Sequence, residues 1–300
     1  MTTQQTTANG ISITFEDKGP RDAPVILLVM GLGGQLTLWP DEFVDALNAH
    51  GFRTIRYDNR DVGLSTRFDS AGVPNLKWMF VKMMLRLPVR PAYRLADMAA
   101  DGVALLDHLG IDRAHIVGVS MGGMISQHIA ARYPERVLSL TSIMSSSGNP
   151  KLPRANREAM AVLANRPMSG DPEDMIAYSV RAARVIGSPA YPAEEERLQR
   201  RVRGDFERGW YPQGVARQMA AIVADGDRRA LLKSITVPTL VVHGEADPLV
   251  PLAAGKDTAA NIPGARLMTI PGMGHDLPLA LVDTLADAVA GHARELAAAA

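Results

Sequence analysis

One serine in this sequence stands between two glycines, at a point where an apolar run gives way to a helical pattern. It is Ser120, in the stretch AHIVGVSMGGMISQHIA at residues 114–130, with Gly118 two residues before it and Gly122 two residues after it. This spacing predicts a sharp turn from a strand into a helix, where small neighbours let the two elements pack closely and the hydroxyl is exposed. A glycine-rich turn with a capping serine has the same pattern, but the position between a strand and a helix favours a nucleophile.

A serine hydroxyl is a weak nucleophile unless a general base accepts its proton. His275 is the expected base, because it follows an expected strand on the glycine-rich loop IPGMGHDLP. Open α/β sheets place functional groups on loops at the carboxyl ends of parallel strands. A loop histidine bonded to the backbone is the alternative. The other six histidines of the chain stand near helix ends, inside helices or on strands.

The base needs an orienting carboxylate, and the stretch VVHGEADPLVP offers one just past another expected strand. Asp247 suits a rigid turn better than its competitor Glu245, because a proline follows it. No carboxylate follows the expected strand LSLTSIM, where the chain reads SSSGNP. Asp276, beside the base, is expected to be solvated or capping. The chain order Ser120, Asp247, His275 is the order found on α/β-hydrolases and differs from the other two common triad orders.

The elements that must position these residues alternate along the chain. Short apolar or alternating runs predict strands at 11–19, 24–31, 52–58, 113–120, 138–146, 237–247 and 265–274. Helical spacing is found between most of them, at 39–51, 95–110, 122–137, 252–262 and 281–296. The alternation predicts a parallel sheet covered by helices on both faces. Between 148 and 214 only helical signals occur, which indicates an inserted helical subdomain, and residues 1–9 are expected to be frayed.

Composition narrows the function classes. The 300 residues are 47% hydrophobic and 21% charged, and the 32 basic residues balance the 32 acidic ones, so the chain as a whole has no electrostatic footprint for nucleic acid or an anionic membrane. The absence of cysteine excludes disulfides, thiolate metal sites and cysteine nucleophiles. The N-terminus MTTQQTTANG lacks the basic start and apolar stretch of a signal peptide, and no run approaches the ~18 apolar residues of a membrane span. A cytoplasmic protein without integral membrane association is expected.

Five stretches resemble the α/β-hydrolase superfamily, and more closely its serine esterase branch that includes aclacinomycin methylesterase. They are LLVMGLGGQLTLWPDEF, IRYDNRDVGLST, AHIVGVSMGG, VPTLVV and IPGMGH, and the resemblance covers nearly the whole chain. It implies an α/β-hydrolase fold with a mostly parallel eight-stranded sheet, flanked by helices, and a helical cap inserted after the sixth strand. The implied domains are a first core part at 1–147, the cap at 148–214 and a second core part at 215–300.

The resemblance also implies an oxyanion hole. Many relatives carry a His-Gly pair after the third strand, and the residue that follows donates its backbone N–H. Here the chain reads Met30-Gly31-Leu32, with methionine in place of the histidine, as in the methylesterase branch. The donor is a backbone group, so Leu32 N–H is assigned to the oxyanion hole. Met121 N–H, at the start of the helix after Ser120, is the second donor.

The predicted reaction is acyl transfer from a small-molecule ester to Ser120, with no metal and no organic cofactor. Enol-lactone hydrolysis, carbon–carbon bond hydrolysis and cofactor-free perhydrolysis remain alternatives on the same residues, because GVSMGG resembles motifs in all three groups. A non-catalytic ligand receptor on the same fold is the alternative of a different class. The oligomeric state and the acyl and alcohol groups of the substrate are not predicted.

Three further stretches each allow two structural or functional interpretations. Residues 76–93, LKWMFVKMMLRLPVRPAY, are interpreted as a flap over an apolar acyl pocket, with an amphipathic helix at a membrane or partner surface as the alternative. The arginine-rich stretch RLQRRVRGDFERG is interpreted as a solvated helix face bridged by glutamates, and otherwise as a site for an anionic substrate. Asp58, Arg60 and Asp61 are expected to tie their loop together, with a role in the pocket wall second.

Overall fold

The computed structural model of the chain describes residues 3–85, 87–164 and 171–297. Its strands form one eight-stranded sheet in the order β1-β2-β4-β3-β5-β6-β7-β8. The strands are β1 Gln4–Ala8, β2 Ile11–Lys18, β3 Val25–Val29, β4 Arg53–Tyr57, β5 Ala114–Val119, β6 Val137–Ile143, β7 Thr239–Gly244 and β8 Arg266–Ile270. The pairs β1–β2 and β2–β4 are antiparallel, and all pairs from β4 to β8 are parallel. The α/β-hydrolase fold predicted from the sequence is confirmed.

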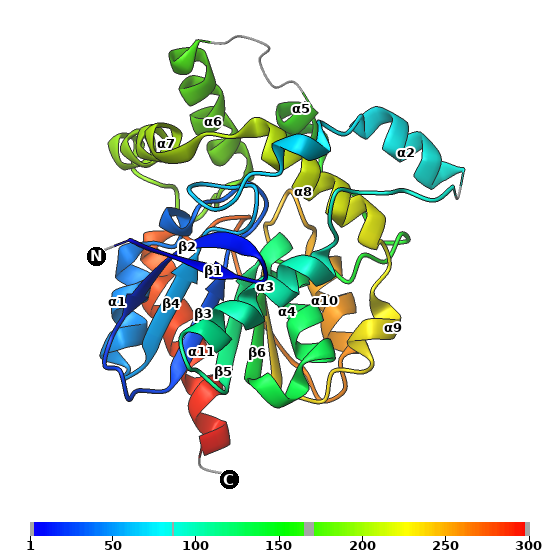
Figure 1. Ribbon diagram of the computed structural model, residues 1–300. Coiled ribbons are helices and arrows are strands. Elements are labelled where there is room, and N and C mark those ends of the chain that lie inside the picture. Colours follow the sequence, from blue (N-terminus) through cyan, green and yellow to red (C-terminus); the bar gives the residue numbers. More distant parts are fainter. Residues whose placement is uncertain (1–2, 86, 165–170, 298–300) are drawn as a thin grey trace.

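Helices cover both faces of the sheet (Figure 1). One face packs against α3 Leu95–His108, α4 Met121–Arg132 and α10 Leu252–Asn261, and the other against α1 Asp41–Ala49 and α11 Val282–Ala297. The central strands β3, β4 and β5 are buried along their whole length, as expected for parallel strands between two helical layers. This burial holds the carboxyl ends of the strands at one edge of the sheet.

Residues 4–8 are not frayed, which corrects that part of the expectation for residues 1–9, while residues 1 and 2 lie outside the described residues. Gln4–Ala8 form β1, which pairs with β2 through a tight turn at Asn9 and Gly10, both with positive φ. An Asn-Gly pair is a strong hairpin signal, because both turn positions require positive φ. The polar sequence of β1 lacks the apolar alternation that predicts a strand. β1 lies at the edge of the sheet, and Ala8 is its one buried residue.

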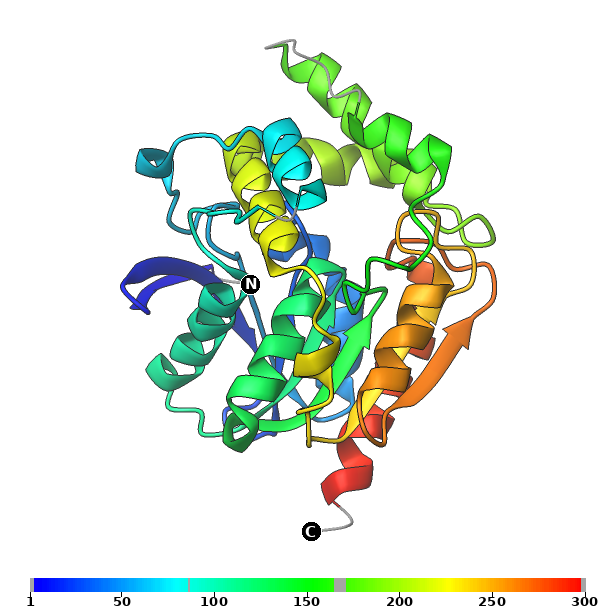
Figure 2. The ribbon, with the colours of Figure 1, turned by 90° about the vertical axis from the view of Figure 1, so that its right-hand side faces the viewer.

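In the described residues, five helices follow β6 and precede β7, and four of them begin in the region where only helical signals occur in the sequence. They are α5 Arg157–Ala164, α6 Pro172–Ile186, α7 Glu195–Gly209 and α8 Pro212–Asp225, and the short α9 Arg229–Leu232 comes next. Figure 2 shows α5 to α8 at one end of the molecule, beyond the carboxyl ends of the strands. The boundary expected at residue 214 falls inside α8, and residues 165–170 of the expected cap lie outside the described residues.

A further helix, α2 Leu76–Met84, precedes α3 and packs against α8. Short 3₁₀ turns occur at Leu36–Leu38, Asp69–Ala71, Pro134–Arg136 and Leu279–Leu281. In the part of the chain that is described, no helix is both long and apolar enough to cross a membrane.

Candidate active site

Ser120 occupies the sharp turn between β5 and α4. Its backbone has φ 54° and ψ −120°, a strained conformation for a residue with a side chain. The flanking glycines allow the helix to start this close to the sheet. A Cβ on Gly118 would lie 2.3 Å from the carbonyl oxygen of Gly122, and a Cβ on Gly122 would lie 2.0 Å from that of Val29. Any side chain at either position would push α4 away from the strands.

A chain of hydrogen bonds joins Ser120 to the two other residues singled out in the sequence. His275 Nε2 lies 3.0 Å from Ser120 Oγ, and His275 Nδ1 lies 2.7 Å from Asp247 Oδ2. The second carboxylate oxygen of Asp247 accepts the backbone N–H groups of Leu249 at 2.9 Å and Val250 at 2.8 Å. His275 and Asp247 are buried, whereas Ser120 is half-buried and accessible.

The competing carboxylates point elsewhere. Glu245 accepts a hydrogen bond from Thr269 Oγ1 at 2.8 Å on the exposed side of β8. Asp276 is half-buried and accepts a hydrogen bond from Ser188 Oγ, so the expectation that it is solvated or capping is wrong. Burial raises the pKa of Asp276, against the opposing effect of this hydrogen bond and of the nearby Arg201 charge. Neither carboxylate reaches the imidazole of His275 in the way that Asp247 does.

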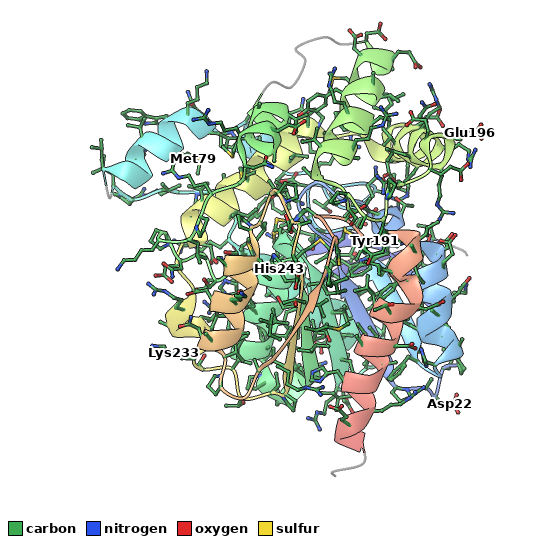
Figure 3. The ribbon with its side chains drawn as sticks, turned by 180° about the vertical axis from the view of Figure 1, so that it is seen from behind. Asp22, Met79, Tyr191, Glu196, Lys233 and His243 are labelled. Carbon is green, nitrogen blue, oxygen red and sulfur yellow. The ribbon has the colours of Figure 1, made fainter. Side chains whose placement is uncertain are left out.

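A second histidine, His243, lies beneath the Asp247 loop at the carboxyl end of β7 (Figure 3). Its Nε2 is 2.8 Å from the carbonyl oxygen of Val250, so Nε2 carries the proton and donates it there. Burial lowers the pKa of His243, although the nearby carboxylate of Asp247, 3.7 Å from Nε2, opposes this. His243 is thus a neutral support for the loop, and its side chain is completely buried.

The loop after β3 lies directly against the serine. A Cβ on Gly31 would be 3.2 Å from Ser120 Cβ and 3.8 Å from Ser120 Oγ. Within the described residues, no protein group accepts the N–H of Leu32 or of Met121. Met121 is the first residue of α4, where backbone N–H groups are unpaired and favour negative charge. Both N–H groups are therefore unpaired among the described residues, one on each of the two segments that meet at Ser120.

The conformation of the loop after β3 depends on residues that the sequence analysis did not predict to be part of the site. Gly33 N donates to Gln218 Oε1 of α8 at 2.8 Å, and Gln218 Nε2 donates to the carbonyl oxygen of Arg60 at 2.8 Å. Asn59 Nδ2 donates to the carbonyl oxygen of Met30 at 2.9 Å. Gln218 is 185 residues from Gly33 and is a glutamine in an ordinary helical pattern, so no local signal could have found it.

The segment after α6 holds the loop that carries His275. The backbone N–H of His275 donates to the carbonyl oxygen of Ile186 at 2.7 Å. Ser188 Oγ accepts the N–H of Gly274 at 2.8 Å and donates to Asp276, so one buried hydroxyl bridges both sides of His275. A helix from the region between β6 and β7 thus fixes the backbone on which the imidazole is mounted.

The loop at residues 58–61 is structural, as expected first. Asp58 accepts the N–H of Leu36 at 2.7 Å and an Arg208 N–H at 2.7 Å, while Arg60 and Asp61 pair with two partners outside the loop, Asp101 and Arg217. Burial raises the pKa of Asp58, opposed by Arg208 and by backbone donors. These pairs connect the sheet to α3, α7 and α8 without a contact to Ser120.

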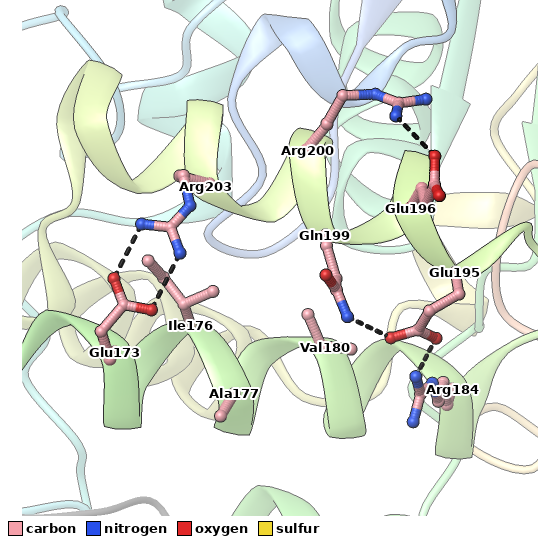
Figure 4. Close-up of a pocket in the computed structure, with 10 residues that line it drawn as sticks. All are labelled: Glu173, Ile176, Ala177, Val180, Arg184, Glu195, Glu196, Gln199, Arg200 and Arg203. Atoms are coloured by element: carbon pink, nitrogen blue, oxygen red, sulfur yellow. Dashed lines mark hydrogen bonds and ion pairs between the residues drawn. The ribbon is translucent and has the colours of Figure 1, made fainter.

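A cavity of about 580 Å³ between α6 and α7 is not part of this site (Figure 4). All of its lining residues come from these two helices, and the charged ones pair with one another. Arg203 holds Glu173 with two hydrogen bonds of 2.7 and 2.8 Å, and Arg184 and Arg200 hold Glu195 and Glu196. The arginines of the arginine-rich stretch that line this cavity, Arg200 and Arg203, are therefore bridged by glutamates, and the paired charges leave no free group for an anion in the cavity.

The arrangement at Ser120 has the parts needed for nucleophilic attack on a carbonyl group. A hydroxyl lies in contact with an imidazole whose other nitrogen is held by a buried carboxylate, which favours the tautomer that accepts the hydroxyl proton. The start of α4 and the loop after β3 meet at this hydroxyl, and each has an unpaired backbone N–H group among the described residues. In the described residues, no group of three or more His, Asp or Glu side chains could hold a metal ion here or elsewhere.

Comparison with known proteins agrees with this chemistry. A family model described as "alpha/beta hydrolase fold" matches residues 24–279. Rhodomycin D methylesterase of Streptomyces sp. strain C5 is 32% identical over 98% of this chain and 99% of its own length. A bifunctional esterase/perhydrolase of Acinetobacter calcoaceticus is 28% identical over 93% of this chain and 95% of its own length. The crystal structure of a hydrolase from Pseudomonas aeruginosa PA01 superposes with a TM-score of 0.69 at 28% identity, covering 98% of both chains.

Proposed function

Since the chain belongs to the α/β-hydrolase family, we propose that it is a serine hydrolase that cleaves carboxylic esters through an acyl-enzyme on Ser120. One observation carries the proposal. The His275 imidazole contacts Ser120 Oγ at 3.0 Å through one nitrogen and Asp247 at 2.7 Å through the other, beside the Gly31 backbone. Binding of a ligand alone does not require such a chain of three groups, which argues against a receptor.

The reaction proceeds in two halves. His275 Nε2 takes the hydroxyl proton as Ser120 Oγ bonds to the ester carbon, and the carbonyl electron pair moves to the oxygen, which the N–H groups of Leu32 and Met121 stabilise. Collapse of this intermediate breaks the ester bond, and His275 protonates the leaving alcohol. Water, deprotonated by the same imidazole, then releases the acid from Ser120. Asp247 stays ionised throughout and stabilises the imidazolium.

The substrate class we propose is a fairly apolar small-molecule ester. Two half-buried apolar side chains belong to the segments that meet at the nucleophile: Leu32 on the loop after β3 and Met124, one turn into α4. The related rhodomycin D methylesterase supports a methyl ester as the first substrate to try. Methionine and leucine offer an adaptable apolar surface for the acyl group rather than a set of hydrogen-bonding groups.

We propose that the chain is divided, as expected from the sequence, into a first core part, a helical cap and a second core part. We place α5 to α8 over the site as the cap, because segments after α6 and on α8 hold the His275 loop and the Gly31 loop. A boundary after Asp225 instead of at 214 would keep α8 whole. The cytoplasmic location expected from the sequence stays a prediction.

The test is the release of p-nitrophenol from p-nitrophenyl acetate and butyrate by the wild type, Ser120→Ala and Ser126→Ala. We expect a burst equal to the enzyme concentration followed by steady turnover in the wild type. Ser120→Ala should lose the burst and reduce kcat on the order of 10⁴–10⁶-fold. Ser126, on α4 with no hydrogen-bond partner for its buried hydroxyl in the described structure, is the matched control and should retain activity as alanine.

A folded wild type without ester turnover would contradict the proposal. The same protein would then be assayed with enol lactones, with substrates for carbon–carbon bond hydrolysis, and with acetate plus hydrogen peroxide for peracid formation. The relative described as an esterase/perhydrolase makes peracid formation the first alternative. Tight binding of an ester without any turnover would instead support a ligand receptor.

A further inference from the structure

Exposed apolar side chains concentrate on one short segment of the molecule. Among the described residues, nine large hydrophobic side chains are exposed, and five of them lie between residues 73 and 87. They are Val73 at 62%, Trp78 at 53%, Val81 at 41%, Leu85 at 62% and Leu87 at 47%. Single exposed apolar residues are normal on a protein surface, but a cluster this dense in sequence indicates a surface with a partner.

The apolar side chains of α2 that the structure describes divide between a side that packs against the protein and a side that is exposed. Met79 is 8% exposed and belongs to the side that meets α8. Trp78, Val81 and Leu85 follow the spacing i, i+3, i+7 and share a face that points away from Met79. Figure 1 shows α2 standing out at the edge of the molecule, at the same end as α5 to α8. The outward face is therefore not needed to fold α2 onto the body.

The same segment has a strong local charge. Residues 70–96 contain five basic residues and no acidic one, although the whole chain is neutral. Lys77 is exposed, and Lys82 Nζ lies 5.9 Å from the centre of the Trp78 ring, so cationic groups border the apolar face. Arg86 belongs to this set by sequence and lies outside the described residues. The segment around α2 is therefore basic, although the net charge of the whole chain is zero.

We propose that α2 and its flanks dock on an anionic lipid bilayer surface. Apolar side chains that include a tryptophan, bordered by lysine and arginine, match the boundary between lipid headgroups and acyl chains. The apolar side chains of Trp78, Val81 and Leu85 enter this boundary, and the flanking cations contact lipid phosphates. Because α2 packs on α8, whose Gln218 holds the loop next to Ser120, docking places the candidate active site close to the bilayer, where apolar esters partition.

The test is sedimentation of the full chain with vesicles of phosphatidylcholine alone and of phosphatidylcholine with phosphatidylglycerol. We expect at least about tenfold tighter binding to the anionic vesicles, weakened by salt, with a blue shift of tryptophan emission. The variant Trp78→Ser/Val81→Ser/Leu85→Ser should lose binding at least about tenfold, and Lys77→Gln/Lys82→Gln should lose the preference for anionic lipid. Leu267→Ser/Leu279→Ser changes exposed leucines elsewhere and should bind like the wild type.

Three outcomes would overturn the inference. Equal binding to both vesicle types would show that the partner is not an anionic surface. An equal loss of vesicle binding in the control variant Leu267→Ser/Leu279→Ser would show that the binding does not depend on α2. Absence of vesicle binding together with dimers that the triple serine variant abolishes would assign the face to a second copy of the chain. The assay measures no turnover, so its failure leaves the proposed esterase activity untouched.

Discussion

Each oxygen of the Asp247 carboxylate has its own partner. Oδ1 accepts two backbone N–H groups from its own turn, and Oδ2 faces the imidazole of His275. The turn therefore fixes the plane of the carboxylate before the histidine is considered. The neighbouring His243 adds a buried neutral support without a competing charge. The orientation of the Asp247 carboxylate therefore comes from backbone groups of its own turn.

A buried histidine far from Ser120 makes stability depend on pH. His115, at the start of β5, bonds to Ser139 Oγ at 2.8 Å, and burial, with the nearby charges of His292 and Arg113, lowers its pKa to about 4. The unfolded chain therefore binds more protons than the folded one between about pH 6.5 and 4. The contribution of His115 to the free energy of unfolding is complete above pH 6.5. It falls by roughly 3 kcal/mol as the pH decreases to 4.

Urea unfolding of the wild type and His115→Gln at pH 7 and pH 4.5 checks this. Other titrating groups are common to both proteins, so only the difference between them reports on His115. The wild type should lose about 2–3 kcal/mol more of its free energy of unfolding than the variant does. Equal losses in the two proteins would show that His115 carries its charge in the folded state.

At the scale of elements, the His275 loop depends on the segment that follows α6. Ser188 bridges Gly274 and Asp276 on either side of the histidine. Ser188→Ala removes both contacts, and we expect kcat to fall roughly 10- to 100-fold with KM little changed, because a small displacement of a base costs about this much.

The control for this experiment is Ser179→Ala, in α6 itself, where the hydroxyl only donates to the carbonyl oxygen of Met175. That variant should keep the wild-type kcat. A change in KM alone in Ser188→Ala would place the serine in substrate binding, and an unchanged kcat would show that the backbone contact of His275 with Ile186 is sufficient.

At the scale of the whole molecule, the apolar core is divided. Two large clusters fill the two faces of the sheet, and a small separate one lies between α6 and α7. The small cluster consists of Ile176, Val180, Leu198 and Val202, with Ala183 and Phe206 packed against it. A core of this size stabilises two helices only weakly, so α6 and α7 should open without global unfolding.

This division predicts different effects for the same substitution in two places. Leu140→Ala, in the main core under α4, should lower the free energy of unfolding by about 2–5 kcal/mol. Leu198→Ala should leave the midpoint of global unfolding nearly unchanged and speed amide hydrogen exchange across residues 172–209. Hydrogen exchange by mass spectrometry with thermal denaturation measures both, and an equal drop in melting temperature would show that core and cap unfold together.

The sequence by itself determined the fold class and the three residues at the centre of the site. Ser120, Asp247 and His275 were each recognisable because turn chemistry is local: small residues before and after the serine, a proline after the aspartate, and glycines before the histidine. The parallel order of the strands then requires their carboxyl ends to meet at one edge. Local signals combined with that topology were enough to predict a meeting point.

Only the tertiary structure decided what holds that meeting point together and what surrounds it. Gln218 and Ser188 act on loops 185 and 86 residues away, and Arg208 reaches Asp58 across 150 residues. β1 exists because β2 offers an edge for pairing, and α2 keeps an apolar face exposed because α8 covers only its other side. Such contacts depend on which surfaces folding brings together, and a hydrogen bond between distant side chains leaves no pattern in the backbone propensities of either segment.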